Sequence, residues 1–119
     1  MINNTDTAQK TINLSYLESI SSGNKEFVKE MVNLFLSENP EEIKSLENAI
    51  TEKNHKSIKT IAHKLRSTIP FMGLDKIIEK DVAEIEKLAA NNADVKEIEQ
   101  RFAKVKEVCE KSYYELSPI

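Results

Sequence analysis

The sequence predicts an all-α fold: an antiparallel up-and-down four-helix bundle with a short extra N-terminal helix. From Leu14 onward apolar residues recur at helical spacing, and no alternating pattern typical of a strand extends beyond a few residues. The chain of 119 residues contains only 2 glycines and 3 prolines, too few for the many turns of a β-sandwich or barrel. Four long amphipathic segments joined by short turns most simply pack as a bundle.

A short helix and a long helix open the predicted bundle. The first is expected to end at about Ser21, with Asn13 or Ser15 as its candidate N-cap. The second is expected over residues 24–53, with apolar residues along one side. Pro40 lies inside this second segment, removes a backbone donor and clashes with the preceding turn. We therefore expect a kink or a break there.

Three further helices complete the pattern. One is expected from about Asn54, a plausible N-cap, to Met72 or Gly73, and glycine is a suitable residue to end it. The next is expected over residues 74–90 and the last over residues 94–116. Asp81 falls in the middle of the apolar arc of its helix, and nothing in the local sequence explains it.

Composition limits the function. The net charge of −3 gives no general attraction to nucleic acid, and no apolar run is long enough to span a membrane. A single cysteine, Cys109, excludes an internal disulfide and a multi-cysteine metal site. Residues 1–13 are polar, lack the pattern of a secretory signal and are expected to form a flexible tail before a domain at residues 14–117. We expect a cytoplasmic protein.

His63 is the residue of chemical interest, because it lies mid-helix but off the apolar face. Helical spacing places Lys59 four residues before it, Arg66 three residues after it and Ser67 four residues after it, with Lys64 at the flank. The pattern predicts an exposed imidazole surrounded by cations. Nearby positive charge disfavours the imidazolium, so we expect a neutral ring that is a good nucleophile near pH 7.

The residues around His63 resemble a known signature. The run Ala62–Ser67, followed by Phe71–Leu74, is similar to the motif of the histidine-containing phosphotransfer (HPt) domain. That motif has a basic residue three positions after the histidine, a small residue at four and a glycine about ten positions on. Arg66, Ser67 and Gly73 occupy these positions, although glycine is commoner than serine at the small position.

The resemblance extends from about residue 14 to residue 88. Residues 14–17 and 23–27 look like the family's opening helix and turn, and residues 35–40 look like its mid-helix break. Ile85 and Glu86 resemble an apolar–acidic pair on the next helix.

Membership of this family implies a phosphorelay carrier in two-component signal transduction. His63 would accept a phosphoryl group from the aspartyl phosphate of a receiver domain and pass it to another receiver aspartate. The resemblance also implies no kinase activity and no cofactor or metal of its own, because the receiver supplies the Mg²⁺. The implied partners are response-regulator receiver domains and a hybrid sensor kinase, and the implied state is a monomer. The residues expected to contact the phosphoryl group or partner are Lys59, Lys64, Arg66, Ser67 and Phe71.

The alternative is a phosphotransfer-inactive bundle that only binds a receiver domain or another partner. The presence of the imidazole with a basic residue three positions later favours the carrier.

Other candidate residues give weaker indications of a functional role. Glu52 and His55 have the spacing found in di-iron bundles, but no second pair exists, so we interpret His55 as solvated. Cys109 lies in the apolar seam of the last helix and is expected to be inert. Leu34, Leu36 and Phe71 fall between core and surface. They fit an apolar rim around His63 and satellite core packing equally well.

Overall fold

The computed structural model describes residues 11–116, of which 84% are helical and none lies in a strand. The predicted all-α fold is confirmed. No helix within this range is long and apolar enough to cross a membrane. The elements are the α-helices α2 (Ser15–Ile20), α3 (Lys25–Thr51), α4 (His55–Thr68), α5 (Asp75–Ala90) and α6 (Val95–Leu116), and the 3-10 helix η1 (Ile69–Met72) between α4 and α5.

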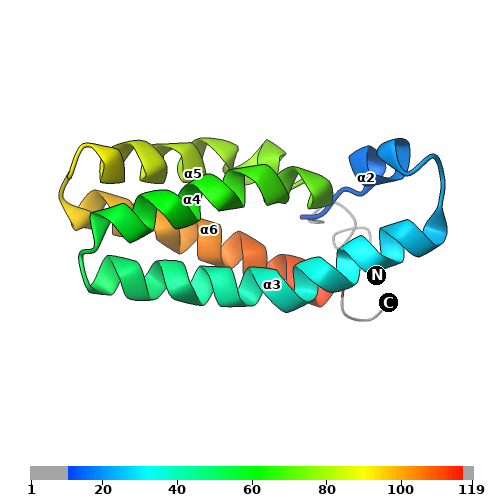
Figure 1. The fold of residues 1–119 in the computed structure, drawn as a ribbon, viewed down its shortest axis with the longest axis horizontal. Coiled ribbons are helices and arrows are strands. Elements are labelled where there is room, and N and C mark those ends of the chain that lie inside the picture. The colour runs from blue at the N-terminus through cyan, green and yellow to red at the C-terminus, as the bar shows by residue number, and fades with distance from the viewer. Residues whose placement is uncertain (1–10, 117–119) are drawn as a thin grey trace, which may run out of the picture.

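Helices α3 to α6 run in alternating directions and form an up-and-down bundle, while α2 lies at one end beside the start of α3 (Figure 1). Each of the four contributes to a single apolar core, which includes Leu46, Ile58, Leu65, Ile85 and Val105. The most extensive packing between helices joins α4 and α5. This antiparallel pair carries His63, so the register between its two helices decides what faces the imidazole.

Helix α3 is continuous through Pro40, so the break that was one of the two predicted outcomes does not occur. Its N-terminal part does run at an angle to the rest of the helix (Figure 1), which agrees with the expected kink. Phe35 and Ile43 are buried on either side of the proline. Next to it the buried Asn39 accepts a hydrogen bond from the hydroxyl of Tyr113 on α6. Packing on both sides of Pro40 therefore holds the helix together where one backbone hydrogen bond is missing.

The predicted third helix comprises α4 and η1. Asn54 is the N-cap of α4, and its Oδ1 accepts from the backbone N–H of Ser57 at 3.1 Å. The last turn tightens into η1, which contains Pro70. Gly73 then ends the segment with φ of 74°, a left-handed conformation that favours glycine.

The start of the described chain is held against the bundle. The backbone N–H groups of Thr11 and Ile12 donate to the carboxylate of Glu115 at 2.8 to 2.9 Å. The N-cap of α2 is Leu14, which makes no side-chain capping hydrogen bond, so neither Asn13 nor Ser15 is the cap that the sequence predicted. Asn13 accepts from the N–H of Ser15 at 2.9 Å just before the helix begins. Residues 11–13 of the predicted tail thus make backbone hydrogen bonds to the bundle, and its first ten residues lie outside the described range.

Asp81, unexplained from sequence, is 5% exposed and lies between α5 and α6. Its carboxylate contacts Arg101 at 3.1 Å and Lys104 at 3.2 Å, both on α6. A buried charge is tolerated when it is paired and hydrogen-bonded. The acid therefore ties the two helices together instead of breaking the core.

Candidate functional site

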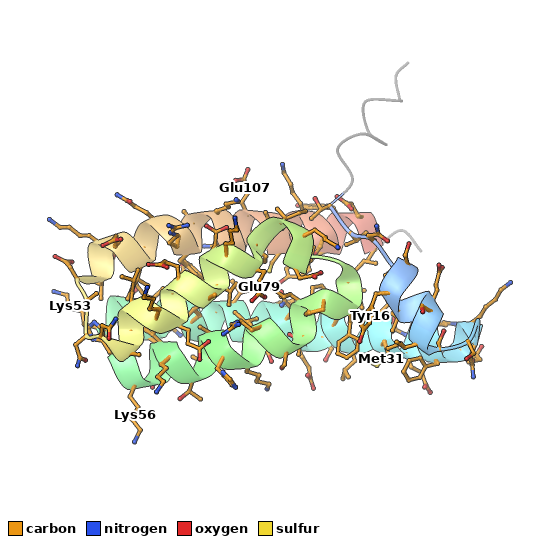
Figure 2. The ribbon with its side chains drawn as sticks, turned by 90° about the horizontal axis from the view of Figure 1, so that it is seen from above. Tyr16, Met31, Lys53, Lys56, Glu79 and Glu107 are labelled. Atoms are coloured by element: carbon orange, nitrogen blue, oxygen red, sulfur yellow. The ribbon has the colours of Figure 1, made fainter. Side chains whose placement is uncertain are left out.

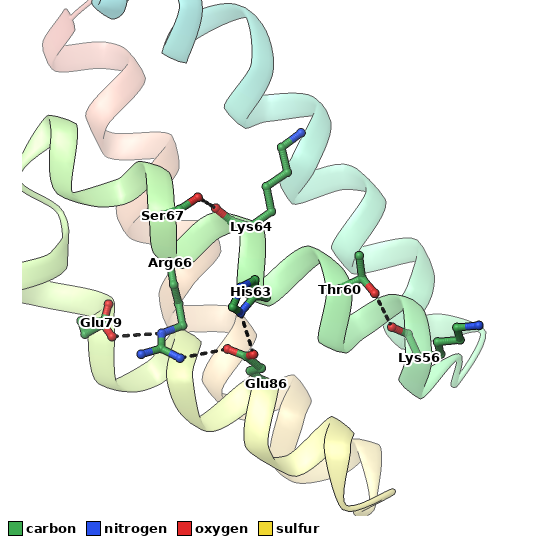
Figure 3. A network of polar contacts seen from close by, with 8 residues as sticks. All are labelled: Lys56, Thr60, His63, Lys64, Arg66, Ser67, Glu79 and Glu86. Carbon is green, nitrogen blue, oxygen red and sulfur yellow. Dashed lines mark hydrogen bonds and ion pairs between the residues drawn. The ribbon is translucent and has the colours of Figure 1, made fainter.

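His63 lies in the middle of α4 with its side chain 75% exposed. Its neighbours Ala62 and Leu65 are fully buried, and this helical phase turns the imidazole outward. The ring Nδ1 lies 2.9 Å from Oε2 of Glu86 on α5 (Figure 3). A carboxylate can only accept, so Nδ1 carries the proton. In the neutral ring this leaves the lone pair on Nε2, the nitrogen that does not face Glu86.

Glu86 is the acid that faces the imidazole. Burial by itself would raise the pKa of its carboxyl group, but hydrogen bonds from Arg66 and His63 outweigh it and lower the pKa below the usual value. Oε1 accepts from Nη1 of Arg66 at 3.0 Å while Oε2 faces His63. Both oxygens of one ionised carboxylate are therefore engaged.

Arg66 is turned toward α5. Its Nε donates to Oε2 of Glu79 at 3.1 Å, and its Nη1 donates to Glu86 (Figure 3). The hydrogen bonds to Glu86 and Glu79 raise the pKa of the guanidinium, so it stays charged. The sequence placed this cation beside His63 but did not predict that two acids from the next helix would hold it.

Two of the three cations predicted beside His63 are paired with acids of neighbouring helices. Like Arg66, Lys64 is paired: its Nζ lies 3.1 Å from Glu42 on α3, and the hydrogen bond to Glu42 raises the pKa of the lysine. Lys59 is exposed and makes no ion pair within residues 11–116. Ser67 is exposed, and its hydroxyl donates to the carbonyl of Lys64 at 2.7 Å.

An apolar cavity of about 200 Å³ lies between α3 and the end of α4 with η1. Leu34, which is 48% exposed, and Phe71 both line it, whereas Leu36 packs against the core. Tyr16 of α2 stacks obliquely on Phe71, with ring centroids 6.0 Å apart. Figure 2 shows Tyr16 and Met31, another lining residue, at the α2 end of the bundle. Glu42 also lines the cavity, so it adjoins the Lys64 ion pair.

Comparison with known families identifies the family of the chain. The Hpt domain family matches residues 30–112, which is more than half of the chain and contains His63 and all its charged neighbours. The chain belongs to the Hpt domain family. No curated protein and no solved structure matches the chain significantly. Hpt domains are phosphocarrier modules of two-component signalling that interact with receiver domains and kinases, and are not kinases themselves.

The other reactive side chains of this Hpt domain lie outside the His63 network. His55 is half-buried and not solvated as predicted, because its Nε2 bonds the carbonyl of Ala93 at 2.7 Å. It thereby ties the start of α4 to the turn between α5 and α6. Cys109 is buried, and burial raises the pKa of its thiol to about 12. Within residues 11–116 no three metal-ligating acids, histidines or cysteines are grouped together.

The sequence did not predict that Glu42, Glu79 and Glu86 contact the residues around His63, although Glu86 stood out as one member of an apolar–acidic pair. Glu79 and Glu86 are seven residues apart, two turns along one face of α5. In an antiparallel pair that turns at Gly73, residues at similar distances before and after the turn lie opposite each other. His63 precedes Gly73 by ten residues and Glu86 follows it by thirteen. That rule could have matched Glu86 to the imidazole.

Proposed function

We propose that this Hpt domain is a phosphorelay carrier whose phosphoryl acceptor is His63. It takes the group from the aspartyl phosphate of one receiver domain and passes it to the aspartate of another. One observation carries the proposal: the exposed imidazole of His63 is held through Nδ1 by Glu86, which leaves the Nε2 lone pair on a side open to a partner.

The chemistry follows from this tautomer. Nε2 of His63 attacks the phosphorus of the aspartyl phosphate, and the phosphorus–oxygen bond breaks. The electron pair leaves with the receiver carboxylate. Positive charge develops on the ring as the nitrogen–phosphorus bond forms, and the carboxylate of Glu86 stabilises it from the Nδ1 side. The second transfer is the same reaction in reverse. The receiver supplies the Mg²⁺ that phosphoryl transfer requires.

Several residues would support the bound phosphoryl group. Lys59 is available to approach it without breaking another ion pair, whereas Lys64 and Arg66 would have to loosen theirs. Ser67 is small and exposed one turn after His63, so a receiver loop can come close to the ring.

Phe71 and the cavity beside it would contact the receiver. Phe71 follows His63 by eight residues, which corresponds to about 12 Å along a helix. A typical protein interface covers about 800 Å² on each partner, so a receiver centred on His63 extends over this distance. We assign response-regulator receivers and the receiver of a hybrid sensor kinase as the partners. A monomer in the cytoplasm, with this face uncovered, completes the proposal.

The test uses His63→Gln, with His55→Gln as the matched control. Each protein is incubated with a receiver domain that carries labelled phosphate. We expect wild type and His55→Gln to gain an acid-labile, alkali-stable phosphate and His63→Gln to gain none. The unfolding free energy of His63→Gln should stay within about 0.5 kcal/mol of wild type, as at exposed sites generally.

Two results would contradict the proposal. If His63→Gln takes up phosphate while His55→Gln does not, the acceptor is assigned to the wrong residue. If wild type binds the receiver but takes up no phosphate, the chain is the phosphotransfer-inactive bundle.

A further inference from the structure

We propose that Arg66 and Glu79 are positioning residues that act on His63 through Glu86. This inference rests on the proposed function and deepens it, because it concerns what prepares the imidazole for attack. The four side chains form a continuous chain of contacts from α5 to α4 and back, in the order Glu79, Arg66, Glu86, His63 (Figure 3).

Both oxygens of the Glu86 carboxylate are held. Oε2 faces Nδ1 of His63 at 2.9 Å, and Oε1 accepts from Arg66 at 3.0 Å. A carboxylate held at one oxygen can rotate about its last bond, whereas one held at both has a fixed plane. Arg66 therefore fixes the direction of the carboxylate, and the carboxylate fixes the tautomer and orientation of the ring.

Arg66 is in turn held by two acids of α5. Its side chain is long and 41% exposed, so one hydrogen bond to Glu86 leaves it much conformational freedom. The additional contact from Nε to Glu79 joins the guanidinium to a second point on the same face of α5. Two anchors seven residues apart direct the guanidinium toward α5 on the Nδ1 side of the ring. Nε2, where the phosphoryl group would be attached, points away from Glu86.

The two possible roles of Arg66 predict opposite effects on the transfer rate when the charge of Glu79 is removed. If Arg66 mainly binds the phosphoryl group, Glu79 competes for it, and removing the charge of Glu79 speeds transfer. If Arg66 positions Glu86, removing that charge loosens the chain and slows transfer, in the same direction as removing Arg66. Glu79 is 38% exposed, so its substitution leaves the core intact.

The experiment compares wild type with Glu79→Gln, Arg66→Ala, Arg66→Lys and the double variant Glu79→Gln/Arg66→Ala. Glu84→Gln is the matched control, because Glu84 lies on the same helix and makes no ion pair within residues 11–116. The phosphoryl donor is phosphoramidate, which is too small to depend on docking. Ammonia leaves its phosphorus as Nε2 of His63 attacks. His63→Gln supplies the blank.

We expect Glu79→Gln and Arg66→Ala each to slow phosphorylation about three- to tenfold, the size of one typical hydrogen bond at an exposed site. The double variant should be no slower than Arg66→Ala, because both act through one chain of contacts. Arg66→Lys should recover part of the rate, and Glu84→Gln should match wild type. The ¹⁵N shifts of the His63 ring should show a smaller Nδ1–H fraction in the slow variants, which a general loss of stability would not produce.

A rate for Glu79→Gln equal to or above wild type would overturn the inference and make Arg66 a phosphoryl ligand. An unchanged Nδ1–H fraction in Arg66→Ala would overturn it as well. The proposed function fails in a different way: wild-type protein would then take up no more phosphate than His63→Gln, from phosphoramidate or from a receiver.

Discussion

Glu86 shows how one side chain adjusts another in this site. Of the two acids that hold Arg66, Glu86 is the more buried, with 17% of its side chain exposed against 38% for Glu79. Burial works against its ionised form, and the hydrogen bonds from Arg66 and His63 more than offset that effect. The folded-state pKa therefore lies below the ordinary value of 4.5, so these contacts stabilise the fold only while the carboxyl group is ionised.

A pH titration of stability tests this ionisation. A depressed pKa contributes stability that is fully present above pH 4.5 and is lost as the pH falls through the folded-state value. We expect wild type to be more stable than Glu86→Gln at pH 7, and the difference in unfolding free energy to shrink as the pH falls below 4.5. Urea unfolding from pH 7 to pH 3 measures it, with Glu84→Gln as the control. A difference independent of pH would contradict the assignment.

Individual residues were predictable from sequence only where helical phase decides their environment. His63 was placed on the exposed side of its helix because the apolar residues beside it define the buried side. Its contact with Glu86 was not predicted, because the two residues meet only through the register between α4 and α5. The same reason applies to Lys64 with Glu42 and to Asp81 with its two cations.

At the scale of elements, the turn between η1 and α5 is constrained both by its backbone conformation and by a neighbouring segment. Gly73 has a positive φ, and a Cβ built there would lie 2.5 Å from the carbonyl oxygen of Asn13 and 2.9 Å from its nitrogen. The segment before α2 passes this close because the N–H of Asn13 donates to the carbonyl of Met72 at 2.9 Å. Gly73 thus allows both the turn and the close approach of the backbone of Asn13.

Alanine substitution at Gly23 and Gly73 separates the cost of a positive φ from the cost of a collision with neighbouring backbone. Gly23 has φ of 81° but nothing within 4 Å of a built Cβ, so Gly23→Ala meets only the backbone strain, about 1 kcal/mol. Gly73→Ala meets the same strain and a collision with backbone, so we expect a loss of about 3 kcal/mol or more. Denaturant unfolding of both variants gives the comparison. Equal losses would mean that residues 11–14 move aside freely.

The helices themselves were predicted well because amphipathic spacing and capping residues are local properties. Asn54 caps α4 as predicted, and Asn24 caps α3. The break expected at Pro40 did not occur, because core contacts on both sides outweigh a local preference. The 3-10 geometry of η1 was also missed, since it depends on how the chain must turn to bring α5 against α4.

In the whole molecule, α5 is the helix that connects the chemistry to the core. One of its faces presents Glu79 and Glu86 to α4 (Figure 3). Another presents Asp81 to α6. The ion pairs of Asp81 therefore fix α5 against α6, while α5 fixes the ring of His63. The orientation of a surface imidazole depends in this way on the packing of three helices.

The hydrogen bonds from Thr11 and Ile12 to Glu115 hold the first and last parts of the described chain close together in space. Because a short linker can join these ends, the order of the helices along the chain can be changed by circular permutation. We expect a circular permutant that joins residue 116 to residue 11 through a short glycine–serine linker, and begins at the exposed Gly23, to fold into the same bundle. Circular dichroism should give unchanged helicity, and the His63 ring should keep its Nδ1 proton. A permutant that stays unfolded would show that α2 must precede α3 for the bundle to form.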